Sequence, residues 1–174
     1  MLSAFRLLAA AFAVVAHSGA AKPEPAFKAL AQLSGADSTI ESPRVVAITS
    51  EADWVTLWRE HRSSFQVGVP TAQQNQDPDR PKIDFDKVAV LGLFGGQSKN
   101  VGGFRVSDSG DSGKDAYVRI EPVLLPNSGT TILQNPYIFV EVPKTKKKII
   151  VQLDQVPLGG EGWRTLAVIQ PTKD

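Results

Sequence analysis

The stretch Ile83–Val106, IDFDKVAVLGLFGGQSKNVGGFRV, decides the expected fold. Its centre, Val88–Phe94, is a nearly unbroken apolar run that contains β-branched residues. A run of this length and composition is typical of a strand that is buried on both faces. The segment after it is flanked by two glycine pairs, Gly95-Gly96 and Gly102-Gly103. Because only glycine takes positive φ without steric cost, these pairs predict sharp turns or a close approach of another backbone.

Further strands are expected on both sides of this stretch, separated by turn residues. We expect them at Phe27–Leu33, Arg44–Thr49, Tyr117–Leu125, Pro136–Val142, Ile149–Leu153 and Thr165–Ile169. Polar residues at Ser107–Lys114 predict a hairpin connection, and the lysines of Lys144–Lys148 predict a hairpin tip. Short strands at this spacing predict a mainly β (α+β) domain, an antiparallel β-sandwich or open barrel with one amphipathic helix packed on it.

The helix is expected to begin after Ser50. The hydroxyl of Ser50 can cap a free backbone amide, and Asp53 lies in the electropositive first turn. Trp54, Trp58 and His61 follow at helical spacing, so their side chains share one face. Since aromatic side chains bury large areas, we expect this face to pack into the core.

The first 20 residues have the layout of a secretory signal peptide, with one basic residue, an apolar segment and then small residues. The apolar segment is shorter than the roughly 20 residues that span a bilayer, so we expect cleavage and no remaining membrane span. We therefore expect a signal peptide at 1–20, a linker at 21–26 and a single domain at 27–170. The chain has no cysteine, which excludes a lipid anchor on cysteine, disulfides and thiol chemistry. The expected location is periplasmic or extracellular.

The charges of the chain nearly cancel. Lys+Arg total 19 and Asp+Glu total 18, so no net field attracts nucleic acid or an anionic membrane. The glycine cluster matches neither the G-x-x-x-x-G-K-[ST] nor the G-x-G-x-x-G order of nucleotide-binding loops. Asp108, Asp111 and Asp115 lie close together, but Gly110 stands where a calcium loop requires a ligand. The sequence therefore predicts no cofactor and no metal.

Enzymatic activity is not expected. Once the signal peptide is removed, His61 is the one histidine of the chain. Nothing around Ser63 or Ser64 resembles the strained turn that carries a nucleophilic serine. A hydrolase therefore requires a hydroxyl or carboxylate from elsewhere within hydrogen-bond reach of His61.

The order of several motifs resembles the PrcB-type domain, a family named after a protease complex subunit of spirochaetes. The motifs are Val45–Ile48 before Ser50, the helix with Trp54, Trp58 and His61, Ile83–Asp86, the two glycine pairs, and Pro136-Tyr137 through Lys144. The resemblance covers about residues 27–153 and implies a non-enzymatic accessory protein of the cell envelope that supports a secreted protease. The family's Thr-Gly-Gly-Tyr signature is matched by Val101–Phe104. Its Pro-Tyr-His pattern is matched by Pro136, Tyr137 and Ile138, so three polar groups of the family are absent.

We therefore expect a protein-binding domain whose partner is a secreted protease or another envelope protein. The residues expected to contact it are Gln97, Asn100, Val101, Gly102, Gly103, Phe104, Pro136 and Tyr137. One alternative is that the glycines only make a tight hairpin and that Phe104 belongs to the core. Another is an envelope module that binds carbohydrate or another small ligand with Trp163, Trp54 or Tyr137 as a stacking platform. The polar segment Ser63–Pro81 is expected to be a long surface loop.

Overall fold

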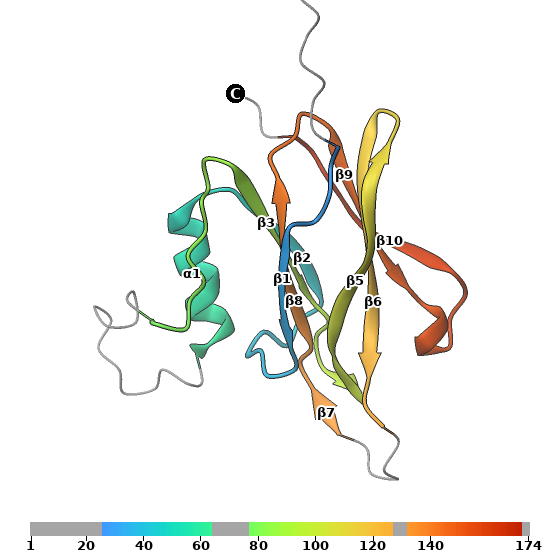
Figure 1. The fold of residues 1–174 in the computed structure, drawn as a ribbon. Helices are drawn as coiled ribbons and strands as arrows, with labels where there is room; N and C mark the ends of the chain where they lie inside the picture. Colours follow the sequence, from blue (N-terminus) through green and yellow to red (C-terminus); the bar gives the residue numbers. More distant parts are fainter. Residues whose placement is uncertain (1–25, 64–76, 127–131, 172–174) are drawn as a thin grey trace, which may run out of the picture.

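A computed structural model describes residues 26–63, 77–126 and 132–171, which form two packed sheets with a helix on one side (Figure 1). The first sheet has the order β1 (Ala31–Gly35), β8 (Tyr137–Pro143), β3 (Val88–Phe94), β2 (Arg44–Ile48). The second has the order β10 (Trp163–Ile169), β9 (Lys148–Asp154), β6 (Asp115–Leu124), β5 (Val101–Ser112). Smaller elements are helix α1 (Glu51–His61), the pair β4 (Ser98–Lys99) and β7 (Leu133–Gln134), and the 3-10 turn η2 (Val156–Leu158). The expected mainly β fold with one helix is confirmed.

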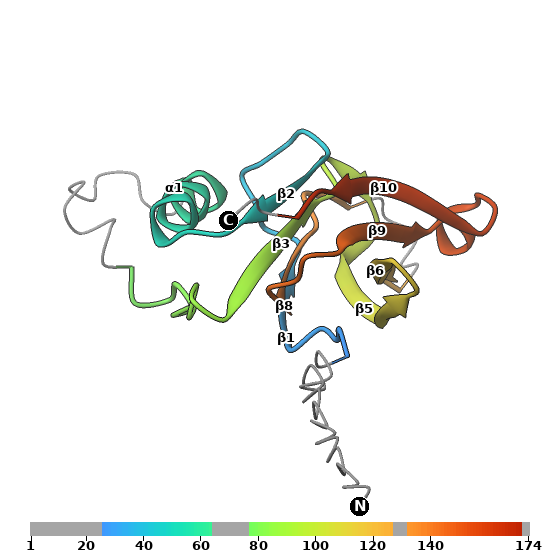
Figure 2. The same cartoon turned by 90° about the horizontal axis from the view of Figure 1, so that it is seen from above.

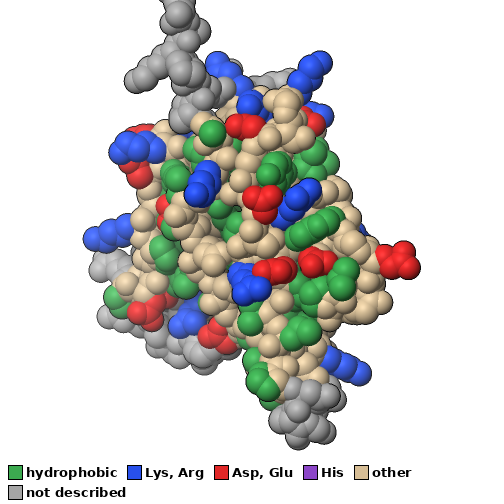
Figure 3. All heavy atoms as spheres, turned by 45° about the vertical axis from the view of Figure 1, so that its right-hand side comes forward, with side chains coloured by type: hydrophobic (Ala, Val, Ile, Leu, Met, Phe, Trp, Pro, Cys, Tyr) green, Lys and Arg blue, Asp and Glu red, His purple; other side chains and the backbone are tan. Residues whose placement is uncertain are grey.

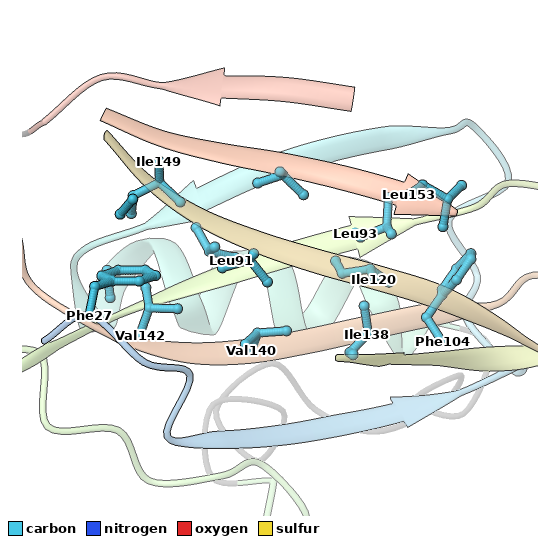
Figure 4. Close-up of a cluster of buried hydrophobic side chains, with 14 of the residues drawn as sticks. Phe27, Leu91, Leu93, Phe104, Ile120, Ile138, Val140, Val142, Ile149 and Leu153 are labelled. Carbon is cyan, nitrogen blue, oxygen red and sulfur yellow. The ribbon is translucent and has the colours of Figure 1, made fainter. Parts of the chain in front are cut away.

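Strand β3 is the centre of a three-layer arrangement, in which the first sheet lies between α1 and the second sheet (Figure 2). All seven residues of β3 are buried, as the sequence predicts. Successive side chains of a strand point to opposite faces. Leu91 and Leu93 accordingly join the core between the sheets, where Figure 4 shows them with side chains of β6, β8 and β9. Val90 and Phe94 join the second core, beneath the helix.

Helix α1 is capped and packed as its sequence predicts. Ser50 is the N-cap, and its hydroxyl accepts a hydrogen bond from the Asp53 backbone N–H at 3.2 Å. The Trp54 side chain is 1% exposed and meets Phe139 of β8 edge-on, with ring centroids 4.9 Å apart. The two indole N–H groups donate to the segment before β3, Trp54 to the Pro81 carbonyl at 3.0 Å and Trp58 to Asp77 Oδ2 at 2.9 Å. The tryptophans therefore fix both the helix and the end of the expected loop, of which residues 64–76 lie outside the described part.

The connection at Lys144–Lys148 differs from the expected hairpin tip. It carries the chain from β8 in the first sheet to β9 in the second. Because β1 and β3 already occupy both edges of β8, the strand that follows has no free position beside it. Strand β9 instead pairs with β6, and this pair is parallel, whereas the other strand pairs are antiparallel.

Three other boundaries also differ from expectation. Strand β5 continues through the polar residues to Ser112, so the hairpin with β6 is reduced to Gly113 and Lys114. Strand β6 begins two residues earlier than expected, at Asp115, and passes through Pro122. The register of β6 with β9 stops at Ile120, so the missing N–H of Pro122 interrupts no ladder on that side. The first strand begins four residues later than expected, although Phe27 is buried in the core between the sheets.

The edges of the two sheets meet along one side, where β1 lies beside β5. Side chains bridge this seam in place of a backbone ladder. The bonds run from Phe104 N to Ser34 Oγ (2.9 Å), Val106 N to Gln32 Oε1 (2.8 Å), Ala29 N to Ser109 Oγ (2.9 Å) and Phe27 N to Asp111 Oδ2 (3.0 Å). These bonds satisfy edge N–H groups that would otherwise be free to pair with another chain.

Within the described residues, no helix has the length and apolar character that a membrane crossing requires.

Replacing Trp54 tests the packing of α1. We expect Trp54→Ala to lower the free energy of unfolding by about 3 to 5 kcal/mol, because it leaves a cavity between helix and sheet. Urea denaturation of the protein expressed without residues 1–20 measures this change. Trp163→Ala is the matched control, since that indole is 40% exposed, and it should cost only about 1 kcal/mol. Equal losses for both variants would contradict the assignment of Trp54 to the core.

Candidate binding surface

The predicted contact residues lie where β3 crosses to β5, and most of them are buried. Gln97 is exposed, and Asn100 and Gly102 are partly exposed. The buried members are Val101, Gly103, Phe104, Pro136 and Tyr137. Phe104 is 4% exposed within the core between the sheets, and Tyr137 is 6% exposed beneath the helix. Of the expected loop-and-corner contact residues, these five are therefore buried in the folded chain, and Gln97, Asn100 and Gly102 are the ones that reach the surface.

Close packing accounts for the glycines at this junction. A Cβ at Gly95 would lie 2.8 Å from the Phe104 ring and 3.0 Å from Pro136. Gly103 has φ +141°, and a Cβ there would lie 2.7 Å from Ser34 Oγ. Phe104 thus belongs to the core, as one sequence alternative held. The connection is not a tight hairpin, however, because β3 and β5 lie in different sheets.

His61 lies in a closed aromatic cage at the end of α1. Its side chain is 0% exposed, and its ring centroid is 4.2 Å from that of Tyr137 and 5.2 Å from that of Phe139. Burial disfavours the charged imidazolium and, together with the nearby Arg62 charge, lowers the pKa of His61 to about 4. His61 is therefore neutral in the folded protein at neutral pH.

Ser38 is the polar partner of His61, with its Oγ 3.0 Å from His61 Nδ1. Sequence patterns do not predict this pair, because 23 residues separate its members. Ser38 is 4% exposed, and its Oγ also accepts a hydrogen bond from the Ile40 N–H at 3.1 Å. As folded, the pair is closed to a substrate. No group of three or more His, Cys, Asp or Glu residues in the described part of the chain is placed to hold a metal ion.

Of the three expected stacking platforms, only Trp163 reaches the surface. Trp54 is 1% exposed and Tyr137 6%, whereas Trp163 is 40% exposed at the start of β10. The Arg119 guanidinium lies over the Trp163 ring at 5.3 Å and over the Tyr117 ring at 5.1 Å. These three side chains form a stacked row across the outer face of the second sheet, held by cation–π attraction.

Polar neighbours fix the stacked row in place. Arg119 Nε donates to Gln152 Oε1 at 3.2 Å, and an Arg119 terminal nitrogen lies 3.6 Å from Asp108 Oδ2. The Tyr117 hydroxyl donates to the same Asp108 oxygen at 3.0 Å, and this bond raises the pKa of Tyr117. Asp108, expected on a solvated hairpin, therefore lies on a strand and orients two side chains of the outer face.

Exposed apolar side chains gather at one end of this face. We call them the outer patch: Val123 (41% exposed), Val156 (61%), Leu158 (45%) and Trp163 (40%). Val123 lies on β6 and the next two on η2, which packs near β6. Figure 3 shows hydrophobic side chains exposed among charged ones on the side of the molecule that carries the second sheet. A cluster of this kind is a usual mark of an interaction site.

Comparison with known proteins finds nothing similar: no family model, curated protein or solved structure matches the chain. The resemblance to the PrcB-type domain therefore stays a prediction from the motifs.

Replacing Gly103 tests the junction. We expect Gly103→Ala to destabilise the fold by about 2 kcal/mol or more, because the new methyl group meets Ser34 and the φ is unfavourable for alanine. Gly113→Ala is the matched control, since Gly113 has φ +61° but nothing within 4 Å of its Cβ position, and it should cost only about 1 kcal/mol. Urea denaturation compares the two. Equal losses of unfolding free energy in the two variants would show that the contact with Ser34 is unimportant.

The buried His61 predicts a loss of stability in acid. Below pH 6.5 the unfolded chain takes up a proton at His61, whereas the folded chain does so only near pH 4. Stability should therefore fall as the pH drops through this window, by about 3 kcal/mol in total from this residue. The measurement is urea denaturation at pH 7 and pH 4 on the mature protein and on His61→Phe. The variant should lose less stability than the wild type, and identical losses would contradict a neutral buried imidazole.

Proposed function

We propose that this protein is an exported, non-enzymatic protein-binding domain and that its partner docks on the outer face of the second sheet. The observation that carries the proposal is the stacked row of Tyr117, Arg119 and Trp163 beside the exposed outer patch. Tryptophan, tyrosine and arginine are the residues that most often dominate binding energy at protein interfaces. Here all three lie side by side on a surface.

The geometry of the row favours binding because its side chains are already ordered. Arg119 is held between two rings and by Gln152, so little side-chain entropy remains to be lost on association. The charges of the face are largely paired with each other, as in Arg105 with Glu121 and Lys148 with Asp115. A partner is therefore expected to be recognised by shape and apolar contact more than by long-range charge attraction.

The sequence motifs support one kind of partner. The resemblance to the PrcB-type domain supports an accessory role toward a secreted protease, and the signal-like first 20 residues support an envelope location. The burial of five residues of the glycine junction favours the outer face over that junction as the contact surface. The proposed accessory role and location thus rest on the sequence. The proposed docking surface rests on the exposed side chains of the outer face.

A second candidate is carbohydrate binding, which the exposed Trp163 ring favours. An exposed indole beside Asp108 and Arg119 offers the combination of a stacking plane and hydrogen-bonding groups that sugars use. Titration with soluble envelope glycans, followed by tryptophan fluorescence, distinguishes this candidate. A fluorescence change that is lost in Trp163→Phe would favour the sugar over a protein partner.

The test of the proposed function is affinity capture from envelope extracts after crosslinking. The baits are the tagged mature protein, Trp163→Ala, and the double variant Val156→Ser/Leu158→Ser. We expect both variants to recover at least about tenfold less partner, because an aromatic anchor or its apolar surroundings is removed. Leu30→Ser is the matched control, since Leu30 is 61% exposed just before β1 of the first sheet, and the variant should leave recovery unchanged.

Circular dichroism and urea denaturation must first show that each bait is folded. Partner recovery that is unaffected by the outer-face variants, or reduced equally by Leu30→Ser, would overturn the assignment of the docking face.

A further inference from the structure

The two sheets part from each other along the side opposite the β1–β5 seam. There the edge strands are β2 and β10, which approach each other less closely than β1 and β5 do. A cavity of about 320 Å³ lies in this gap and is lined by Ala47, Thr49, Ala89, Leu91, Ile149 and Ile169 of the two sheets, together with residues 143–147 and 170–171. Leu91 and Ile149, both labelled in Figure 4, supply apolar surface from β3 and β9.

Ala47 is the solvent-exposed end of the apolar lining of this cavity. It is the cross-strand neighbour of Leu91, so both side chains point toward the second sheet. Leu91 is 2% exposed, whereas Ala47 is exposed. The second sheet therefore covers Leu91 but leaves Ala47 uncovered. Small side chains at Ala47 and Ala89 leave room between the sheets for an apolar group.

The rim of the cavity is basic. Lys144, Lys146 and Lys147 lie on the segment that crosses from β8 to β9, and no Asp or Glu is among the described residues that line the cavity. Lys147 also reaches Asp111 at 2.8 Å, and the Lys144 backbone N–H is held by the Lys87 carbonyl at 3.1 Å. The charge of Lys147 is thus paired with Asp111, whereas Lys144 and Lys146 present exposed side chains at the rim of an apolar cavity.

We propose that this cavity binds an anionic amphiphile, with a single acyl chain between the sheets and its carboxylate or phosphate group at the lysine rim. Ligand cavities of about 300 to 1,000 Å³ with mostly apolar walls and a few placed polar groups are typical of small-molecule sites. Each buried methylene raises affinity by about fourfold, and the lysines select a negative head group by charge-assisted hydrogen bonds. The composition of the walls and the sign of the rim together determine this class of ligand.

This site is independent of the proposed protein-binding function. The outer patch and the stacked row lie on the outer face of the second sheet, whereas the cavity opens between the sheets. Either assignment can fail while the other holds.

The test is titration of the mature protein with dodecanoate and with dodecyl phosphate below their micelle concentrations, followed by calorimetry. We expect one bound molecule per chain. Dodecyl maltoside has the same chain with a neutral head, and inorganic phosphate has the charge without the chain, so both should bind at least about tenfold more weakly. Preference between dodecanoate and dodecyl phosphate identifies free fatty acids or phosphate-bearing lipids as the natural source, and either preference supports the proposal.

Two variants, each with a matched control, locate the site. Ala47→Phe fills the gap from an exposed position and should abolish binding, whereas Ala31→Phe, on the opposite side of the molecule, should not. Lys144→Glu should weaken binding by about tenfold or more, and Lys99→Glu, remote from the rim, should leave it unchanged. Each variant is first shown to be folded by circular dichroism.

Three results would overturn the proposal. They are equal binding of dodecyl maltoside and dodecanoate, full binding by a folded Ala47→Phe variant, and attachment to anionic phosphatidylglycerol vesicles without any binding of the two monomeric amphiphiles.

Discussion

The structure depends on the burial of β3 on both of its faces. This strand contributes Leu91 and Leu93 to the core between the sheets and Val90 and Phe94 to the core beneath α1. One strand therefore joins three layers, and the free energy of burying its side chains is shared between two cores. Strand β8, which pairs with β3 along its whole length, repeats the arrangement with Val140 on one side and Phe139 on the other.

Side-chain chemistry replaces backbone pairing where the two sheets meet. At the β1–β5 seam, Ser34 accepts from Phe104 N–H and donates to the Tyr137 carbonyl, each at 2.9 Å. The Ser34 hydroxyl of β1 therefore bonds to β5 of the second sheet and to β8 of its own sheet. On the opposite side, between β2 and β10, lies the lysine-rimmed cavity. The two sides of the same sandwich therefore differ, with bridging side chains on one and a cavity on the other.

The sequence predicted the features that follow from local physical chemistry. Short-range patterns predict the doubly buried strand, the Ser50 cap and the tryptophan face of α1. The structure contains all three features. What it could not predict depends on residues far apart in the chain. The pairing of His61 with Ser38 and the stacking of Arg119 on Trp163 join segments 23 or more residues apart. The glycine junction was placed on the surface because glycines often mark exposed turns, whereas here they allow Phe104 and Pro136 to pack closely.

The repeated crossing of the chain between the sheets has a consequence for folding. The chain passes from β3 to β5, from β6 to β8 and from β8 to β9, and each passage changes sheet. The first sheet takes strands from Ala31 to Pro143, and the second sheet is interrupted in sequence by β8, so neither sheet can form before segments far apart in the chain meet. Such non-local pairing costs loop-closure entropy early and makes folding slow. The last third of the domain supplies β8 to the first sheet and β9 and β10 to the second, so its deletion would break both sheets at once.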